Sequence, residues 1–501
     1  VRGTNSVDVM TGGGNDSFER FRGLGGADTF IGTTAGFQSI DYSHDNFFGG
    51  GAGVTVNFST NTAVDGFGAT DTFSNINRAR GTEFNDTFIA GSAGARFRGL
   101  DGADTFTGGS GSDRIEYISD SSFGGTAGVT VNLSTGTAVD GFGNTDTFTS
   151  IEQARGTNQA DTLTGGSGSF EQFEGMGGND TIDGGSGTDR VTYENEHFFG
   201  STSTNGVTVN LSSGTATDTF GNTDTLSNIE QVTGTANADS LTGDSNNNAL
   251  IGLGGADGLS GGAGDDSFRV QSNTDIVSGE SINGGTGTDT ILFDSTSATS
   301  VSLVGATLTS IEFIDFGSST GSGLRQTLSV DNTVNLDAEV IQNFTVGSGS
   351  TTDIFDWTSS AKSGNGTTTA SGSDITLLET TSLVSDSLLA TTSNGAIEFN
   401  YTSAKASIDF ATAGEATIVA NIETLLETAN AVASTNPLTN GAINTDMLFV
   451  FYESGTSGGS TSDAVIIRYQ EGAGAEADFN GELSVVGILE SVTDITDTNL
   501  A

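Results

Sequence analysis

Gly108-Gly-Ser-Gly-Ser-Asp113-Arg-Ile-Glu116 is the stretch of this sequence that decides the fold. It is one of four copies of the nonapeptide Gly-Gly-x-Gly-x-Asp-x-hydrophobe-x, and the other copies span residues 184–192, 261–269 and 284–292. The first six residues of each copy predict a glycine-rich turn, whose aspartate and backbone carbonyls are oxygen ligands suited to Ca²⁺. The last three residues predict a short strand whose hydrophobe points into a core.

Degenerate copies of the nonapeptide keep the glycine, aspartate and hydrophobe columns. Asp104 lies eighteen residues after Asp86 and nine residues before Asp113. Because two nonapeptides form one coil of a parallel β-roll, alternate copies are expected to stack on the same edge, where Ca²⁺ between stacked turns would meet several hard oxygens. The degenerate copies are residues 23–30, 99–106, 175–182 and 252–259.

The predicted calcium ligands are the aspartates of this ladder, one asparagine in register with them, and glycines of the turns. Aspartates also favour turns without any metal, so a purely structural role is the alternative for single residues. Ala95 and Phe170 stand where ladder aspartates are expected, and Phe37 lies in a first-unit stretch without a counterpart of Asp113, so several ions at some turns and apolar stacking at others are expected. The predicted ligands are Asp16, Asp28, Asp86, Asp104, Asp113, Asp161, Asp180, Asp189, Asp239, Asn248, Asp257, Asp266, Asp289, Gly109, Gly111, Gly185, Gly187, Gly262 and Gly264.

A longer repeat lies over the short one. Equivalent units start near residues 3, 81, 156 and 234, and fixed-period self-similarity predicts a solenoid whose units bury their apolar edges on one another. Alternation of Val129, Val131 and Leu133 predicts a strand with one buried face inside the unit. The predicted fold class is therefore mainly β: a calcium-binding parallel β-roll or β-solenoid over residues 1–316, followed by a C-terminal domain.

The C-terminal part has a different composition. Residues 317–323 are predicted to be a linker, and residues 324–501 a β-rich or mixed α/β domain. Helical spacing of apolar residues predicts a helix over 413–433, and apolar runs predict strands at 447–452, 464–469 and 483–489. At the other end, residues 2–5 repeat residues 155–158, so the chain is expected to begin inside the repeat register of a longer protein.

The charge excludes several classes of partner. The 501 residues carry a formal net charge of −48, with 63 acidic and only 15 basic side chains. Nucleic acid and anionic membrane surfaces are therefore poor partners, and bound calcium would relieve the self-repulsion. The absence of cysteine excludes disulfides and thiolate metal sites. The sequence contains no stretch of eighteen apolar residues, so it predicts no membrane-spanning helix.

With these motifs, the chain resembles the RTX family, the hemolysin-type calcium-binding repeat proteins, over roughly residues 1–316. The phrases at 128–138, 224–230 and 239–250 carry this resemblance together with the nonapeptides. It implies Ca²⁺ as the ligand, type I secretion with a C-terminal signal inside 324–501, and a place outside or on the surface of a Gram-negative bacterium. Members of the family differ in activity, so the resemblance leaves the function open.

The residues predict no catalytic or cofactor site. The two histidines, His44 and His197, lie at different offsets in loops and are expected to be loop polar groups rather than bases or ligands. We therefore expect a non-enzymatic structural protein that self-associates into a surface layer or filament, with cell-surface polysaccharide as a further candidate partner. The alternatives are the stalk and tip of an adhesin, or the calcium-folding tail of a larger secreted enzyme. An apolar patch is expected where phenylalanines recur in equivalent loops, at Phe47, Phe48, Phe123, Phe198 and Phe199.

Overall fold

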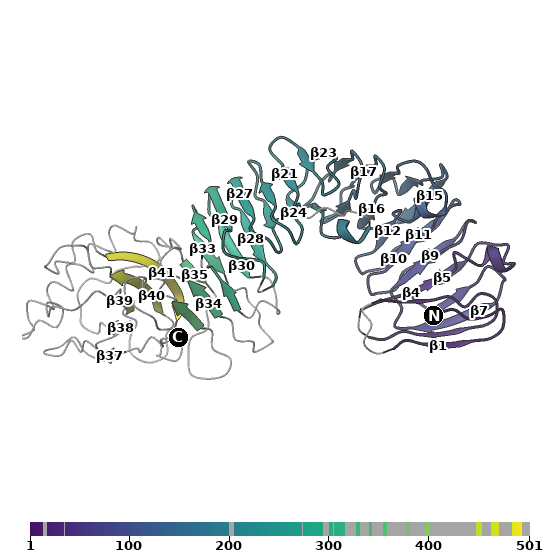
Figure 1. Cartoon of the computed structure of the whole chain (residues 1–501), viewed down its shortest axis with the longest axis horizontal. Coiled ribbons are helices and arrows are strands. Elements are labelled where there is room, and N and C mark those ends of the chain that lie inside the picture. The colour runs from purple at the N-terminus through teal and green to yellow at the C-terminus, as the bar shows by residue number, and fades with distance from the viewer. Residues whose placement is uncertain are drawn as a thin grey trace, which may run out of the picture. The chain divides into compact units, whose positions relative to one another are not determined.

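The fold is known from a computed structural model, which divides into two units, Val1–Thr235 and Ala236–Ala501 (Figure 1). The division falls at the start of the fourth predicted repeat. The predicted linker, the predicted helix and Asp16 lie outside the described residues. The structure describes residues 1–13, 18–34, 36–199, 205–272, 274–293, 300–303 and 305–315, and the backbone of further strands between 327 and 492.

In the first unit, short strands alternate along the chain between two sheets. The first sheet contains β1 (Val9–Thr11), β3 (Thr29–Ile31), β5 (Thr55–Asn57), β6 (Thr62–Val64), β7 (Thr70–Ser74), β9 (Thr87–Ile89), β11 (Thr105–Thr107), β13 (Thr130–Asn132), β14 (Thr137–Val139), β15 (Thr145–Thr149), β17 (Thr162–Thr164), β19 (Thr181–Asp183), β21 (Thr208–Asn210), β22 (Thr215–Thr217) and β23 (Thr223–Ser227). The second contains β2 (Phe18–Phe21), β4 (Phe37–Asp41), β8 (Arg78–Arg80), β10 (Arg96–Arg98), β12 (Arg114–Glu116), β16 (Gln153–Arg155), β18 (Gln172–Glu174), β20 (Arg190–Thr192) and β24 (Gln231–Thr233).

Most strand pairs are parallel and keep the hydrophobic columns in register. Phe106 of β11 lies opposite Phe88 of β9 and Phe148 of β15, and the rings of Phe88 and Phe106 stack with centroids 5.2 Å apart. The hydrophobes of the nonapeptides, Ile115 and Val191, are fully buried between the sheets. Such stacking of a three-residue strand per turn confirms a mainly β fold with two long, largely parallel sheets, as in a β-roll.

Three antiparallel excursions interrupt the parallel order, and the sequence patterns did not predict them. In the repeat around Val129, β13 pairs antiparallel with β14, and β14 with β15, while β15 rejoins the parallel ladder beside β11. The inward residues Val129 and Val131 are buried as predicted, whereas Leu133 lies beyond β13 and is only half-buried. The triplets β5–β7 and β21–β23 repeat the arrangement.

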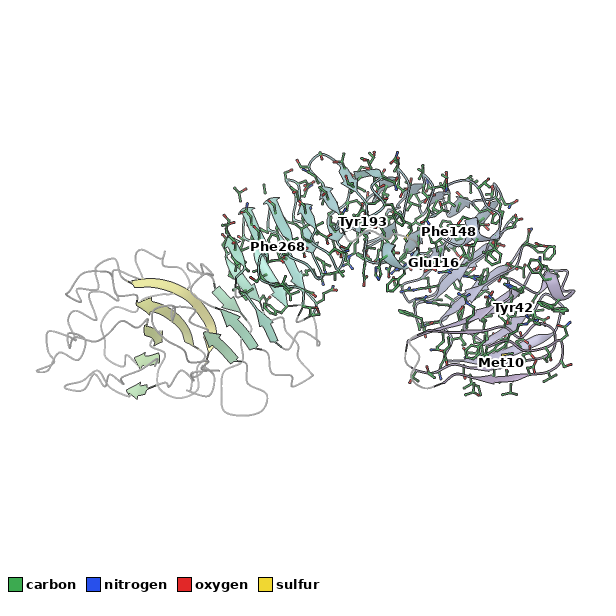
Figure 2. All side chains as sticks on the ribbon, viewed as in Figure 1. Met10, Tyr42, Glu116, Phe148, Tyr193 and Phe268 are labelled. Atoms are coloured by element: carbon green, nitrogen blue, oxygen red, sulfur yellow. The ribbon has the colours of Figure 1, made fainter. Side chains whose placement is uncertain are left out.

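A short helical turn follows each buried tyrosine of the first unit. These turns are η1 (Asn46–Phe48), α1 (Asp120–Phe123) and η2 (Glu196–Phe199). The tyrosines Tyr42 and Tyr193, both 1% exposed, anchor the chain just before it leaves the second sheet (Figure 2).

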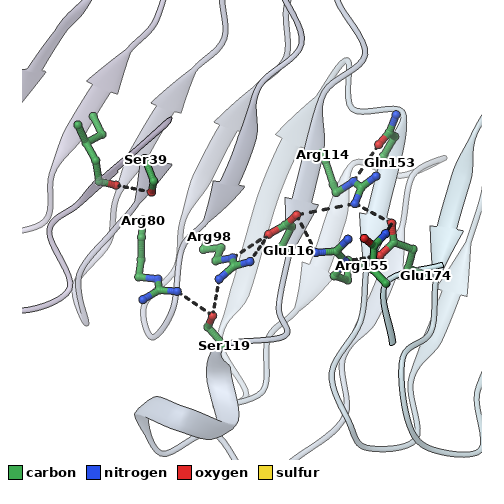
Figure 3. A network of polar contacts seen from close by, with 11 residues as sticks. Ser39, Arg80, Arg98, Arg114, Glu116, Ser119, Gln153, Arg155 and Glu174 are labelled. Atoms are coloured by element: carbon green, nitrogen blue, oxygen red, sulfur yellow. Dashed lines mark hydrogen bonds and ion pairs between the residues drawn. The ribbon is translucent and has the colours of Figure 1, made fainter. Parts of the chain in front are cut away.

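A network of ion pairs covers the outer side of the second sheet (Figure 3). Glu116 pairs with Arg98 at 2.6 Å and with Arg155 at 3.2 Å, and Arg114 pairs with Glu174 at 2.7 Å. Arg155 also binds Glu174 through its Nε. Burial alone would raise the pKa of Glu116, but the arginines around it hold that pKa far below its ordinary value.

The second unit continues the same two-sheet pattern in its described part. Its first sheet contains β25 (Ser240–Thr242), β27 (Gly258–Ala263), β29 (Ser281–Thr286) and β32 (Thr307–Thr309). Its second sheet contains β26 (Ala249–Ile251), β28 (Ser267–Val270), β30 (Thr290–Phe293), β33 (Phe313–Asp315) and β35 (Val340–Gln342), so the parallel pairing extends past the predicted linker. A third sheet is formed by β31 (Ser300–Ser302), β34 (Thr327–Val330) and β36 (Ile354–Trp357). The remaining strands are β37 (Leu378–Thr380), β38 (Ala396–Phe399), β39 (Met447–Tyr452), β40 (Ser462–Tyr469) and β41 (Leu483–Val492).

Candidate calcium sites

The ladder aspartates lie in the turns that lead into the strands, and all described members are buried. Asp86 and Asp104 precede β9 and β11 of the first sheet, whereas Asp113 precedes β12 of the second. Copies nine residues apart therefore lie on opposite edges, and copies eighteen apart stack on one edge, as the spacing predicted. Turns into the first sheet hold Asp28, Asp86, Asp104, Asp161, Asp180, Asp239 and Asp257, and turns into the second hold Asp113, Asp189, Asn248, Asp266 and Asp289.

Along the first edge, each carboxylate is hydrogen-bonded to the backbone of the preceding coil. The N–H of Asp86 donates to Oδ1 of Asp104 at 2.8 Å, and the N–H of Asp104 donates to Oδ1 of Asp146 at 2.8 Å. Asp161, Asp180 and Asp224 repeat this set of three. One carboxylate oxygen of each aspartate thus satisfies a backbone donor, which is the turn-forming role that aspartate favours in any protein.

The hydrogen-bond partner of the second carboxylate oxygen, Oδ2, differs between the three positions of each set of three aspartates. In the first position, Oδ2 of Asp86 accepts the N–H of Thr82 at 2.7 Å. In the third, Oδ2 of Asp146 accepts the hydroxyl of Tyr117 at 2.9 Å. In the middle position, Oδ2 of Asp104 is buried and has no hydrogen-bond partner. The same is true of the equivalent oxygens of Asp28, Asp180 and Asp257.

Glycine makes room for each of these middle carboxylates. A Cβ added to Gly99 would lie 1.7 Å from Oδ2 of Asp104, and one added to Gly175 would lie 2.2 Å from Oδ2 of Asp180. The turn backbone therefore wraps around a buried carboxyl oxygen that no protein donor satisfies. An unpaired buried carboxylate oxygen is costly, and a hard cation is the ligand that this donor type prefers.

The second edge follows the same principle with different partners. The N–H of Glu171 donates to Oδ1 of Asp189 at 2.8 Å, and the N–H of Asp189 donates to Glu230 at 2.8 Å. Oδ2 of Asp189 has no hydrogen-bond partner, as for Asp266 and Asp289, whereas Oδ2 of Asp113 accepts the N–H of Gly109 at 2.6 Å.

Two sequence-based assignments on this edge change. Glu171, not Phe170, is in ladder register with Asp189, because the spacing from Asp161 to Asp180 is one residue longer than the usual eighteen. In the first repeat, Gln38 takes the position of Asp113, since its N–H donates to Asn77 at 3.1 Å just as Asp113 donates to a glutamate in the next coil. That stretch has a counterpart after all, but an uncharged one.

The predicted turn glycines lie against the backbone of the neighbouring coil. A Cβ on Gly109 would lie 1.7 Å from the carbonyl oxygen of Gly91, and one on Gly187, at φ +138°, would lie 2.4 Å from that of Gly168. Successive turns therefore approach each other through their main chains. Gly111, Gly185, Gly262 and Gly264 show the same close approach.

Burial and mutual repulsion disfavour the charged form of these aspartates. Burial, followed by the neighbouring carboxylate, raises the pKa of Asp104 to about 10 and that of Asp180 to about 9. Burial also raises the pKa of Asp257 to about 7 and that of Asp28 to about 6. At neutral pH a bound divalent cation would supply the positive charge that stabilises the ionised form of these aspartates.

The residues present fit such an ion only if the backbone takes part. Within the described ranges, no group of three or more His, Asp or Glu side chains is placed to hold a metal by itself. Carbonyl oxygens of the closely stacked turns would have to complete the shell, as Ca²⁺ with its six to eight oxygen ligands allows. The middle aspartates Asp28, Asp104, Asp180 and Asp257, with Asp189, Asp266 and Asp289, are the side chains that would hold the ion.

The sequence patterns missed the ladder members that do not belong to nonapeptides. Asp71, Asp146 and Asp224 each complete a set of three and bind a buried tyrosine hydroxyl. The signal was present, because each aspartate is followed by threonine and a phenylalanine or leucine, which is the end of a nonapeptide without its glycines. Of the glutamates of the second edge, Glu152, Glu230 and Glu312 each end a recurring Ser/Asn-Ile-Glu phrase that could have indicated them, whereas Glu171 follows no such pattern.

The stacked, carboxylate-lined turns define a β-roll of the calcium-binding class. The profile of the RTX calcium-binding nonapeptide repeat matches four segments of the chain, residues 91–116, 147–169, 171–195 and 233–268. The chain thus carries RTX repeats, which typically bind Ca²⁺ and indicate a type I secreted, extracellular protein of Gram-negative bacteria. No curated protein matches the chain. In the part that the structure describes, no helix is long and apolar enough to cross a membrane.

The raised pKa values predict how stability depends on pH without calcium. A carboxyl group whose pKa is raised in the folded state binds its proton more tightly when the protein is folded. Its contribution to the free energy of unfolding therefore grows as the pH falls through its folded-state pKa, which ranges from about 10 for Asp104 to about 6 for Asp28. Glu116 and Glu174, whose pKa values are lowered by arginines despite burial, act oppositely and lose their contribution below about pH 4.5. Chelated protein should therefore be most stable near pH 5, by at least about 3 kcal/mol over pH 8 at about 1.4 kcal/mol per pKa unit.

Circular dichroism of the chelated protein between pH 4 and 9 measures this effect as a gain of strand structure when the pH falls towards 5, and urea unfolding in millimolar calcium gives the comparison. With calcium bound, the free energy of unfolding should depend little on pH above pH 6, because the ion takes the place of the protons on the buried carboxyl groups. A chelated protein that is equally stable at pH 5 and pH 8 would contradict the assignment of the buried carboxylates.

Proposed function

We propose that this protein is a calcium-stabilised extracellular structural protein that self-assembles into a surface layer or filament and catalyses no reaction. The observation that carries the proposal is a pair of outward-facing aromatic rings in equivalent loops of the repeat. Phe47 of η1 and Phe198 of η2 are each 71% exposed. Large exposed phenylalanines at repeated positions are suited to contacts between copies, since contact would remove their apolar area from water.

The five recurring phenylalanines divide into two classes. Phe48, Phe123 and Phe199 pack over arginine guanidinium groups, with Phe48 4.3 Å from Arg2 and Phe199 4.9 Å from Arg155. These three serve the fold through cation–π contacts. The predicted apolar patch therefore reduces to Phe47 and Phe198, and Ser122 takes the equivalent position in the repeat between them.

Two features of the histidines support a non-enzymatic role. His44 faces Ser43 Oγ at 3.0 Å, but that hydroxyl donates to the buried Asp41 at 2.6 Å. The serine proton is thus directed to a carboxylate already paired with arginines, and the imidazole does not activate the hydroxyl as a base would. His197 lies exposed in η2, and its ring contacts that of Phe198 with centroids 3.7 Å apart and planes tilted by 41°.

The Phe47→Ser/Phe198→Ser variant tests the assembly. In millimolar calcium we expect the parent chain to form ordered sheets or filaments by negative-stain electron microscopy, and the variant to remain dispersed with an unchanged circular dichroism spectrum. Val64→Ser/Val139→Ser is the matched control, because these valines are about as apolar and 40% and 41% exposed but lie on the first sheet.

Each alternative function predicts a different result. A parent that stays monomeric in calcium would argue against assembly and favour an adhesin stalk or the tail of an enzyme. Normal assembly of the phenylalanine variant would remove these rings from the interface. Loss of assembly in the valine control would show that general surface hydrophobicity, rather than this pair, is responsible.

A further inference from the structure

The basic side chains of this acidic protein are concentrated on the outer side of the second sheet in the first unit. Ile40, Ala79 and Phe97 point inward and are buried, so their neighbours along each strand point outward. On strands β2 to β18 these outward positions, with Arg22 directly after β2, hold eight of the 15 basic residues of the chain. They are Arg20, Arg22, Arg78, Arg80, Arg96, Arg98, Arg114 and Arg155.

Three carboxylates occupy the same outward positions, so the positive charge is in excess. Asp41 is shared by three arginines, with distances of 2.8 Å to Arg22 and 3.6 Å to Arg80 and to Arg20. Glu116 and Glu174 are shared by the remaining paired arginines of the network in Figure 3. The outward positions therefore hold eight arginines against three carboxylates.

Arginines lie directly opposite arginines on neighbouring strands. Arg96 of β10 is in register with Arg78 of β8 and with Arg114 of β12, and Arg80 is in register with Arg98. Like charges in register destabilise a sheet. Burial and the neighbouring arginines lower the pKa of Arg78 to about 9 and that of Arg96 to about 10. A ligand with spaced negative charges would relieve this repulsion.

Part of this surface is accessible. Arg2 is exposed, and the side chains of Arg20 and Arg22 are 34% and 25% exposed. Arg78 and Arg96 are half-buried and lie over the ring of Phe37 at 3.9 Å and 4.8 Å, and that ring is itself 44% exposed. We call Arg2, Arg20, Arg22, Arg78 and Arg96 the arginine face.

We propose that the arginine face binds a linear polysaccharide that carries carboxylate groups. Neighbouring strands are about 4.8 Å apart, so Arg78 and Arg96 present adjacent guanidinium groups, and Arg20 lies two strands from Arg78 in the same row; each can bind a carboxylate through two parallel hydrogen bonds. Phe37 offers an apolar surface for the face of a sugar ring. An extended anionic chain fits a row of charges better than a small anion does.

The charge of the whole chain disfavours the other anionic polymers. Nucleic acid carries a far denser charge and would be repelled by the acidic remainder of the molecule. Repulsion of a sparsely charged polysaccharide is weaker and is screened beyond about 8 Å at physiological salt. A second copy of this chain is the competing occupant, because it also is acidic, and the experiment separates the two.

Binding of hyaluronan oligosaccharides to the full chain in millimolar calcium tests the proposal, since this carboxylated polysaccharide does not gel with calcium. We expect saturable binding at 0.15 M NaCl by isothermal titration, weakening as salt rises, and no binding of dextran. Arg96→Gln should weaken binding about threefold and Arg78→Gln/Arg96→Gln about tenfold, as expected for hydrogen bonds between charged groups at a partly exposed site.

Arg190→Gln is the matched control. Arg190 lies on the same side of the sheet, but its side chain binds Gln231 at 2.6 Å, and its neighbours in register are glutamines. This variant should bind as the parent does. The proposal fails if the parent does not bind, if dextran binds equally, or if Arg190→Gln weakens binding as much as Arg96→Gln. Altered sedimentation of the double variant without any polysaccharide would assign the face to contacts between copies instead. Because the salt dependence of the parent is an independent readout, the test does not depend on folding of the variants.

Discussion

Removal of calcium is expected to unfold the β-roll at neutral pH. A site occupied at one hundred times its dissociation constant contributes about 2.7 kcal/mol, and several sites together equal the whole stability of an ordinary domain, which is about 5 to 15 kcal/mol. Without the ion, the middle carboxylates keep a buried oxygen that has no hydrogen-bond partner, as Asp104 and Asp180 show. Circular dichroism during a calcium titration should follow a cooperative gain of strand structure, reversed by chelator.

Asp180→Ala tests this expectation at a single residue. The variant removes the carboxyl oxygen that has no hydrogen-bond partner, and we expect the midpoint of the calcium titration to move severalfold to higher concentration. Asp189→Ala and Asp266→Ala should behave in the same way, whereas Asp113→Ala should have a smaller effect, because both oxygens of Asp113 bind backbone N–H groups.

Glu83→Ala is the control for these variants, since Glu83 is exposed and lies outside the ladder. Its calcium midpoint should match that of the parent. If Asp180→Ala titrates like the parent as well, the middle aspartates only shape the turns, and the ions are held elsewhere.

Glu116→Gln is expected to cause the largest loss of stability of any single substitution in the ion-pair network. The carboxylate is 2% exposed and pairs with Arg98 and Arg155, so its loss leaves the largely buried Arg98 without its carboxylate partner and Arg155 with Glu174 alone. Breaking a buried pair in this way costs about 3 to 5 kcal/mol. Urea unfolding at saturating calcium measures the change without interference from the ion.

A double-mutant cycle distinguishes charge from packing in this network. Arg98→Gln/Glu116→Gln should cost less than the sum of the two single variants, because the second substitution removes one of the stranded charges. A loss below about 1 kcal/mol for Glu116→Gln, or strict additivity in the cycle, would show that the network is solvated and contributes little.

Much of the calcium ladder could be read from the sequence because its spacing is local. A turn of six residues and a strand of three place Asp104 and Asp113 on opposite edges whatever the rest of the chain does. Positions that depend on an inserted residue could not be read in this way. Counting in nines indicated Phe170, while the register of β18 and β20 shows Glu171 on the ladder.

The sequence by itself determined the mainly β fold, the coil of two nonapeptides and the oxygen-rich turns, since all three follow from a short repeated pattern of glycine, aspartate and hydrophobe. Only the tertiary structure decided which carboxylate oxygens are left without partners, because that depends on a tyrosine about thirty residues away along the chain, as between Tyr117 and Asp146. It also decided that arginines from separate repeats form one face. Arg78, Arg96 and Arg114 follow the eighteen-residue spacing of stacked coils, whereas Arg20 and Arg78 come to one side of the sheet only because β4 pairs with both β2 and β8.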